Sequence, residues 1–122
     1  MKIRFLLLPI LMLGALPGAV LAHAFPQAEK PRVGSTISSA PADAAIVFDA
    51  PIESLFSKLQ VLNSSGRAED AGKPQVTGKK NTLTVKLKPL KPGDYTVKWS
   101  VVAEDGHRTE GSYTFTISGG GS

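Results

Sequence analysis

Residues 90–101 read LKPGDYTVKWSV, and this stretch decides the fold. A Pro92-Gly93 turn is followed by apolar residues at every second position, from Tyr95 to Val101, with polar side chains between them. This period of two predicts an extended strand with one buried face and one solvent-facing face. A tyrosine directly after such a turn also suits a tyrosine corner, in which the hydroxyl bonds back to the preceding backbone. That corner is typical of immunoglobulin-like sandwiches.

Other runs along the chain show the same alternation. Residues 59–61, 82–88 and 113–117 alternate apolar with polar side chains, and residues 44–48 are apolar enough for a central strand. Residues 25–33 contain two prolines and suit the edge of a sheet. Turn residues separate these runs, and residues 51–56 have room for a single helical turn. The pattern predicts an all-β, immunoglobulin-like Greek-key β-sandwich, in which Trp99 is a core residue rather than a platform for a ligand.

The first 22 residues have the order of a secretory signal peptide. Two cationic residues are followed by an apolar run over 5–13 and by small residues up to Ala22. We therefore expect a signal peptide at 1–22, one domain at 23–118 and a flexible Gly/Ser tail at 119–122. Cleavage after Ala22 leaves 100 residues, enough for one compact domain. Cleavage after Ala24 also satisfies the small-x-small rule and is the alternative.

The composition excludes several classes of function. The chain has no cysteine, and both methionines, Met1 and Met12, lie in the predicted signal peptide. The exported protein would therefore have neither disulfides nor sulfur ligands for a metal. The net charge of +4 falls to +2 when Lys2 and Arg4 are removed, which gives little support for nucleic-acid binding. G-x-S-x-G, glycine-rich phosphate-loop and H-E-x-x-H motifs are absent from the sequence, so we expect that the protein is not an enzyme.

The positions of the two histidines suggest a metal site. His23 would be the first residue after cleavage, where its α-amine and imidazole Nδ1 can close a chelate ring on a metal. Asp105 and His107 are two residues apart, so both side chains can lie on one side of an extended segment. Three nitrogens and one oxygen suit Cu(II), although Zn(II) and Ni(II) also accept such donors. The alternatives are a surface histidine and an ordinary Asp-Gly turn.

Taken together, the motifs resemble those of the CopC family of periplasmic copper-binding proteins. The resemblance extends over essentially the whole of the predicted domain. It is carried by His23-Ala24 at the start, AIVFDAP at 45–51, FSKLQV at 56–61, LKPGDYTVKW at 90–99, DGH at 105–107 and GSYTF at 111–115. The order of a leading histidine, a Pro-Gly-x-Tyr turn, a tryptophan and an Asp-Gly-His sequence is specific.

This resemblance implies a seven-stranded sandwich that holds one Cu(II) per chain in the bacterial periplasm. It assigns the ligands to the amine and imidazole of His23, the carboxylate of Asp105 and the imidazole of His107. It also implies a role in copper storage, transport or tolerance, alongside a CopD-type inner-membrane copper transporter. We expect the protein to be a monomer.

Two features of the sequence differ from those of many family members. The methionine-rich Cu(I) site of many relatives is not expected here. Asp49 stands where the family often has Glu; we expect it to accept a hydrogen bond from a ligand imidazole, or else to be a solvated carboxylate at a strand end.

Two other functions are alternatives to a copper carrier: a copper redox enzyme of the lytic polysaccharide monooxygenase type and a metal-free structural module. A fully occupied donor set favours storage or transport, because catalytic metals keep an open position.

Overall fold

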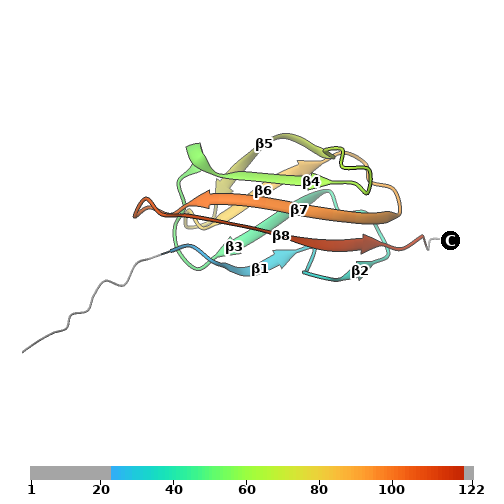
Figure 1. The fold of residues 1–122 in the computed structure, drawn as a ribbon, viewed down its shortest axis with the longest axis horizontal. Helices are drawn as coiled ribbons and strands as arrows, with labels where there is room; N and C mark the ends of the chain where they lie inside the picture. The colour runs from blue at the N-terminus through green and yellow to red at the C-terminus, as the bar shows by residue number, and fades with distance from the viewer. Residues whose placement is uncertain (1–22, 120–122) are drawn as a thin grey trace, which may run out of the picture.

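The protein is a sandwich of two β-sheets packed face to face, as Figure 1 shows. The computed structural model describes residues 23–119, so the predicted signal peptide and the last three residues of the tail lie outside the described residues. The elements in chain order are β1 (Pro26–Lys30), β2 (Thr36–Ile37), β3 (Asp43–Phe48), the 3₁₀ turn η1 (Ser54–Phe56), β4 (Lys58–Leu62), β5 (Asp70–Thr77), β6 (Thr82–Leu87), β7 (Gly93–Val102) and β8 (Arg108–Ile117).

The chain crosses repeatedly between the two sheets. One sheet has the strand order β1-β3-β6-β5, and the other has the order β2-β8-β7-β4. All neighbours are antiparallel except β2 and β8, which pair in parallel over two residues. The predicted Greek-key β-sandwich is confirmed. The short β2 brings the number of strands to eight in the described part of the chain, against the seven that the resemblance implies.

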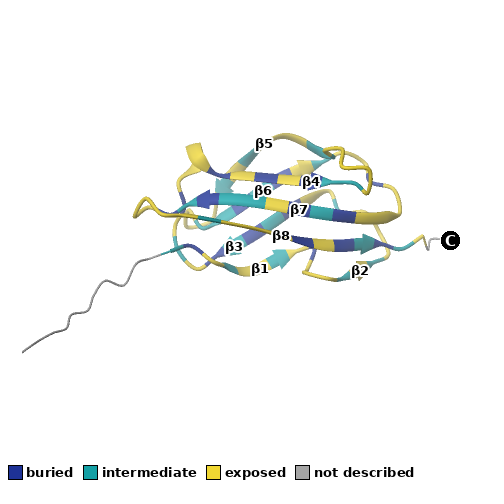
Figure 2. Ribbon diagram, in the orientation of Figure 1, coloured by how far each residue is buried: buried dark blue, intermediate teal, exposed yellow. Residues whose placement is uncertain are grey.

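The core consists of the inward-facing residues of both sheets. Figure 2 shows the burial alternating along β4 and β7, as the period of two in the sequence predicts. Val97 and Val101 of β7 are fully buried, as are Ile46 and Phe48 of β3. The Tyr95 hydroxyl donates a 2.5 Å hydrogen bond to the carbonyl oxygen of Lys91, which is the predicted tyrosine corner.

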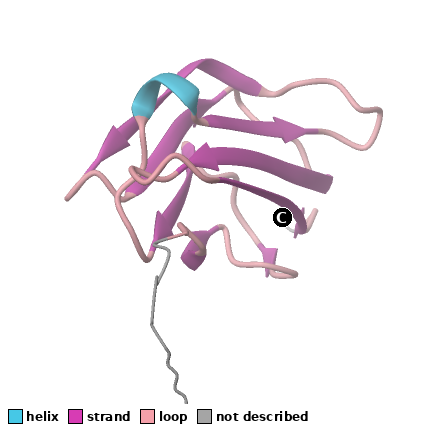
Figure 3. Cartoon of the chain, turned by 60° about the vertical axis from the view of Figure 1, so that its left-hand side comes forward, coloured by secondary structure: helices cyan, strands magenta, loops and turns pink. Residues whose placement is uncertain are grey.

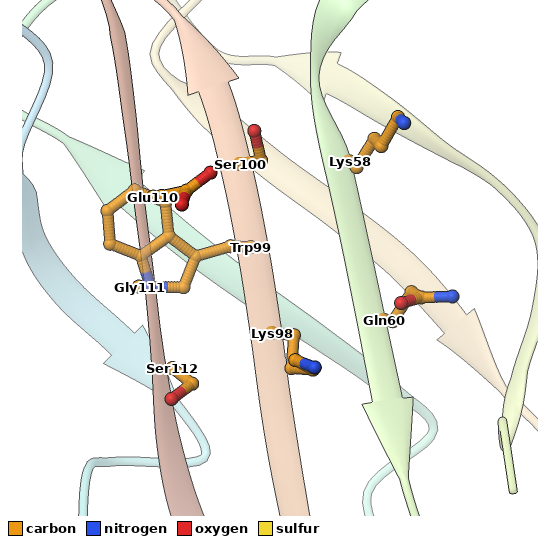
Figure 4. Close-up of a pocket in the computed structure, with 8 residues that line it drawn as sticks. All are labelled: Lys58, Gln60, Lys98, Trp99, Ser100, Glu110, Gly111 and Ser112. Atoms are coloured by element: carbon orange, nitrogen blue, oxygen red, sulfur yellow. The ribbon is translucent and has the colours of Figure 1, made fainter.

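Trp99 packs against the core next to a glycine on the neighbouring strand. It pairs with Gly111 of β8, and its ring meets Phe48 edge-on with 5.3 Å between the ring centroids. A Cβ atom at position 111 would lie 2.7 Å from Cζ2 of Trp99, so the indole occupies the space that a side chain would need. Figure 4 shows the ring reaching from β7 to β8 beside the outward-pointing side chains of the sheet. The prediction that Trp99 is a core residue agrees with this packing.

Two strands of the structure were not predicted from the sequence. β5 lacks a clean alternation because its pairing with β6 is irregular between Ala71 and Gln75, and most of its residues are exposed. β2 is too short to give a pattern. The helical turn expected within residues 51–56 is present as η1. Among the described residues, no helix is long and apolar enough to cross a membrane.

One end of the sandwich carries the turn between β7 and β8, the start of β1 and η1. These segments lie together in Figure 1, and Figure 3 brings this end of the molecule forward. Backbone contacts fix the arrangement, since the amide of Glu53 donates to the carbonyl of Val102 and the amide of Glu104 donates to the carbonyl of Pro51. The three predicted metal ligands are at this end.

Candidate metal centre

His23, Asp105 and His107 lie side by side in the structure. Each offers one ligand atom such that all three atoms are within 4.8 Å of one another. The imidazole rings of His23 and His107 have centroids 4.7 Å apart, although one precedes β1 and the other precedes β8. The fold thus brings together the three residues singled out in the sequence.

A tight turn, rather than an extended segment, presents Asp105 and His107. The amide of Ala103 donates to the carbonyl of His107 at 2.9 Å, and the amide of Gly106 donates to the carbonyl of Ala103 at 2.8 Å. Gly106 has a φ of 91°, a left-handed conformation that glycine adopts at little cost. The expectation of an extended backbone between the two ligands is therefore corrected, because the hairpin reverses direction at Gly106.

One carboxylate oxygen of Asp105 orients the imidazole of His107. Oδ1 accepts a 3.0 Å hydrogen bond from the backbone N–H of His107 and lies 3.2 Å from Nδ1 of the same residue. The backbone hydrogen bond, more than the side-chain contact, lowers the pKa of Asp105 below its ordinary value. A proton on Nδ1 would face Oδ1, which would leave the lone pair on Nε2 to bind a metal. The other carboxylate oxygen, Oδ2, remains available as a ligand.

Hydrogen bonds from two other strands fix the segment that carries His23. The Thr109 hydroxyl donates to the carbonyl oxygen of Ala24 at 2.6 Å, and Ala24 is fully buried. The amide of Phe25 donates to Oδ1 of Asp49 at 2.8 Å, and the amide of Asp49 donates back to the carbonyl of Phe25 at 2.9 Å. The residues beside His23 are thus held before the first strand begins.

Asp49 and Thr109 differ in how far the sequence indicated their contacts. For Asp49 the sequence left two alternatives, a hydrogen bond to a ligand imidazole and a solvated carboxylate at a strand end; in the structure its Oδ1 accepts the backbone amide of Phe25, where β1 meets β3. Thr109 was not predicted at all. A threonine on the strand after the Asp-Gly-His motif has no distinctive pattern, and only the pairing of distant segments gives its hydroxyl a role.

The residues present fit a metal ion. Metal–ligand bonds of about 2 Å hold two donors at most about 4 Å apart, so donors within 4.8 Å reach a common ion by small side-chain rotations. Two imidazoles and a carboxylate, without sulfur, are donors for a borderline divalent metal.

Comparisons with known proteins agree with this fold and identify its family. The CopC domain family matches residues 27–118, a range that includes Asp105 and His107 and begins just after His23. The copper transport protein CutJ of Bacillus subtilis (strain 168) is 35% identical over 116 residues, which are 93% of this chain but only 21% of CutJ. The protein YobA of Escherichia coli (strain K12) is 30% identical over 112 residues, 90% of each chain.

Solved structures with the same fold include two copper proteins. CopC from Methylosinus trichosporium OB3b is 28% identical with a TM-score of 0.73, over 79% of this chain and 94% of that chain. PcoC, a methionine-rich copper resistance protein from Escherichia coli, is 26% identical with a TM-score of 0.70, over 79% of this chain and 99% of that chain. The family match spans well over half of the sequence and nearly the whole sandwich. The chain therefore belongs to the CopC family, whose members bind and transport copper and are not enzymes, as its sequence motifs predicted.

Proposed function

We propose that this protein is a periplasmic carrier of one Cu(II) ion. After export and removal of residues 1–22, the ion is held by the α-amine and imidazole of His23, the carboxylate of Asp105 and the imidazole of His107. The observation that carries the proposal is the 4.7 Å separation of the two imidazole rings, which are the only two in the sequence. Chance would seldom place both histidines, with a carboxylate, at one end of a sandwich.

The chemistry of the donors supports the Cu(II) state. Cu(II) heads the divalent affinity order and favours nitrogen and oxygen ligands in a tetragonal arrangement. Cu(I) prefers thiolates and thioethers, and Met1 and Met12, the only methionines, lie in the segment that export removes. PcoC is described as methionine-rich, and this chain differs from it in that respect. One cluster of nitrogen donors among the described residues supports a stoichiometry of one ion per chain.

Four donors around one ion favour carriage over catalysis. A catalytic metal keeps an open position for its substrate, and Asp105 would occupy that position here. This argues against a copper redox enzyme of the monooxygenase type. A purely structural immunoglobulin-like module without a metal would not require the three ligands to cluster as they do.

We further propose that a CopD-type inner-membrane transporter exchanges copper with this carrier. In CutJ, a copper transport protein, the region similar to this chain makes up 21% of the length, so most of CutJ lies outside the CopC-like part. In at least one relative, a region similar to this chain is therefore part of a longer copper transport polypeptide.

A Cu(II) titration of the processed protein, observed by electron paramagnetic resonance, tests the proposal. We expect saturation at one ion and superhyperfine coupling to several nitrogens. The same titration with His107→Ala should give fewer coupled nitrogens. Saturation far from one ion, or a spectrum with oxygen ligands alone, would reject the site. Rapid production of hydrogen peroxide with ascorbate would instead favour the redox enzyme.

A further inference from the structure

Thr109 connects the strand that follows His107 to the segment that carries His23. Its hydroxyl donates to the carbonyl of Ala24 at 2.6 Å, across two segments far apart in the sequence. His107 directly precedes β8 and Thr109 is the second residue of this strand, and both contact the segment that carries His23. The imidazole of His107 meets the ring of His23, and the Thr109 hydroxyl meets the next residue, Ala24. Between them, Arg108 donates to the Ser100 hydroxyl at 2.6 Å.

The segment ahead of β1 needs such a connection. His23 to Phe25 precede the first strand, so no sheet pairing from β1 holds His23 itself. Chain ends fray unless contacts tie them down, and fixing the backbone of a residue costs conformational entropy. A terminal histidine that was free to move would incur this cost each time it bound a metal.

We propose that Thr109 is a positioning residue of the copper site. By holding the carbonyl of Ala24, its hydroxyl keeps the backbone of His23 against His107 before the ion arrives. The bonds between Phe25 and Asp49 fix the same segment from the opposite sheet, and the burial of Ala24 anchors it. The metal then binds to a site that is already assembled. This inference rests on the proposed function, because it concerns the terminal ligand of that site.

Variants of two threonines on β8 test the proposal. Thr109→Val keeps the shape of the side chain and removes its hydroxyl, whereas Thr109→Ser keeps the hydroxyl. Thr116→Val is the matched control, because the Thr116 hydroxyl donates to Oδ1 of Asp94 at 2.9 Å near the other end of the same strand. All variants are exported as the full chain and purified after processing, and Cu(II) affinity is measured by competition with a chelator of known affinity.

We expect Thr109→Val to lower Cu(II) affinity by about tenfold, which corresponds to about 1.4 kcal/mol. Thr109→Ser and Thr116→Val should bind like the parent. The paramagnetic resonance spectrum of Thr109→Val should also be broadened or show more than one species, because His23 no longer has a single position. If the weaker binding came only from a general loss of stability, the spectrum would not show more than one species, and Thr116→Val would bind Cu(II) more weakly as well.

Each result bears on one proposal or the other. If the parent bound Cu(II) without nitrogen coupling, the proposed function would be wrong. If the parent bound as expected and Thr109→Val matched Thr116→Val in affinity and spectrum, the positioning role of Thr109 would be overturned and the function would stand. Should Thr109→Val not fold, Asp49→Ala removes the neighbouring bond to Phe25 and must show the same weaker, heterogeneous binding for the proposal to hold.

Discussion

Asp105 illustrates how one side chain can serve two purposes at a small site. Its Oδ1 accepts the backbone amide of His107 and faces Nδ1 of the same residue, so the carboxylate fixes both the turn and the ring. Its Oδ2 is left to contribute to the proposed metal site. The turn itself depends on Gly106, whose φ of 91° is a left-handed conformation that glycine adopts at little cost.

Replacing the proposed ligands should weaken copper binding in a defined order. His107→Ala removes a nitrogen donor and should lower Cu(II) affinity by more than about 100-fold, since even the loss of a supporting contact costs about 10–100-fold. Asp105→Ala removes the weaker oxygen donor and should have a smaller effect. Chelator competition measures both, with Glu110→Ala on the outer face of β8 as a control carboxylate. Parent-like affinity in both variants would exclude these ligands.

Copper should be released on acidification by protonation of the nitrogens rather than of the carboxylate. The hydrogen bond from the backbone of His107 lowers the pKa of Asp105, so this carboxylate stays ionised when the imidazoles and the α-amine take up protons. Affinity should therefore fall as the pH is lowered from about 7 to about 5, because protons compete with the metal for the nitrogen ligands. A titration of affinity against pH checks this. Constant affinity over that range would argue against nitrogen ligands.

The lowered pKa of Asp105 also makes the stability of the metal-free protein depend on pH, at a lower pH than the proposed copper release. A carboxyl group whose pKa is lower in the folded state contributes stability above its unfolded pKa, and that contribution is lost as the pH falls through the folded value. For Asp105 this loss lies below about pH 4, well under the pH at which copper should leave.

At the level of secondary structure, the strands differ in how well the sequence predicts them. β3, β4, β6, β7 and β8 were predicted because a half-buried antiparallel strand must alternate apolar and polar residues. β5 was missed because it is an edge strand whose pairing with β6 is irregular, so burial imposes no alternation. The edge position of β1 was predicted from its prolines.

The residues of the candidate site also differ in how well the sequence predicts them. The three metal ligands could be proposed because two rare histidines and an Asp-Gly-His motif stand out in the sequence. The contacts of Asp49 and Thr109 could not, because both bind backbone atoms of a segment that only the folded chain brings near. Another polar residue at position 49 or 109 would fit the same alternation of apolar and polar residues, so the sequence pattern does not reveal these contacts.

Gly111→Ala should destabilise the sheet of β7 and β8. The new Cβ atom would lie 2.7 Å from Cζ2 of Trp99, and the ring is held by its edge-on contact with Phe48. We expect a loss of about 1–3 kcal/mol in the free energy of unfolding, the usual cost of overpacking. Urea denaturation measures it, and Trp99, the only tryptophan in the chain, reports the change by its fluorescence. Gly119→Ala is the control, since its Cβ would meet only Pro92, at 3.9 Å. Equal stability of the two variants would show that the indole can move aside.

For the molecule as a whole, export and metal binding are linked by one peptide bond. Only a chain that begins at His23 has a histidine with a free α-amine, and a chain cleaved after Ala24 would begin at Phe25 and lose the ligand altogether. Because β1 begins at Pro26, neither cleavage would remove a strand of the sandwich. The fold would therefore persist while the proposed site was completed or lost.

The final prediction compares the processed protein with a form that keeps one residue ahead of His23. The extra residue converts the α-amine into an amide, which is a poorer donor at neutral pH, so Cu(II) affinity should fall by at least about tenfold, or about 1.4 kcal/mol. The melting temperature of the metal-free protein should be unchanged, because the first strand of the sandwich, β1, begins after His23. Intact-mass analysis of periplasmic protein identifies the natural first residue, since cleavage after Ala22 and after Ala24 give masses that differ by one His and one Ala. Chelator competition then compares the two forms at equal pH. Equal Cu(II) affinity in both would mean that the amine is not a ligand, and the site would have to bind copper through side chains alone.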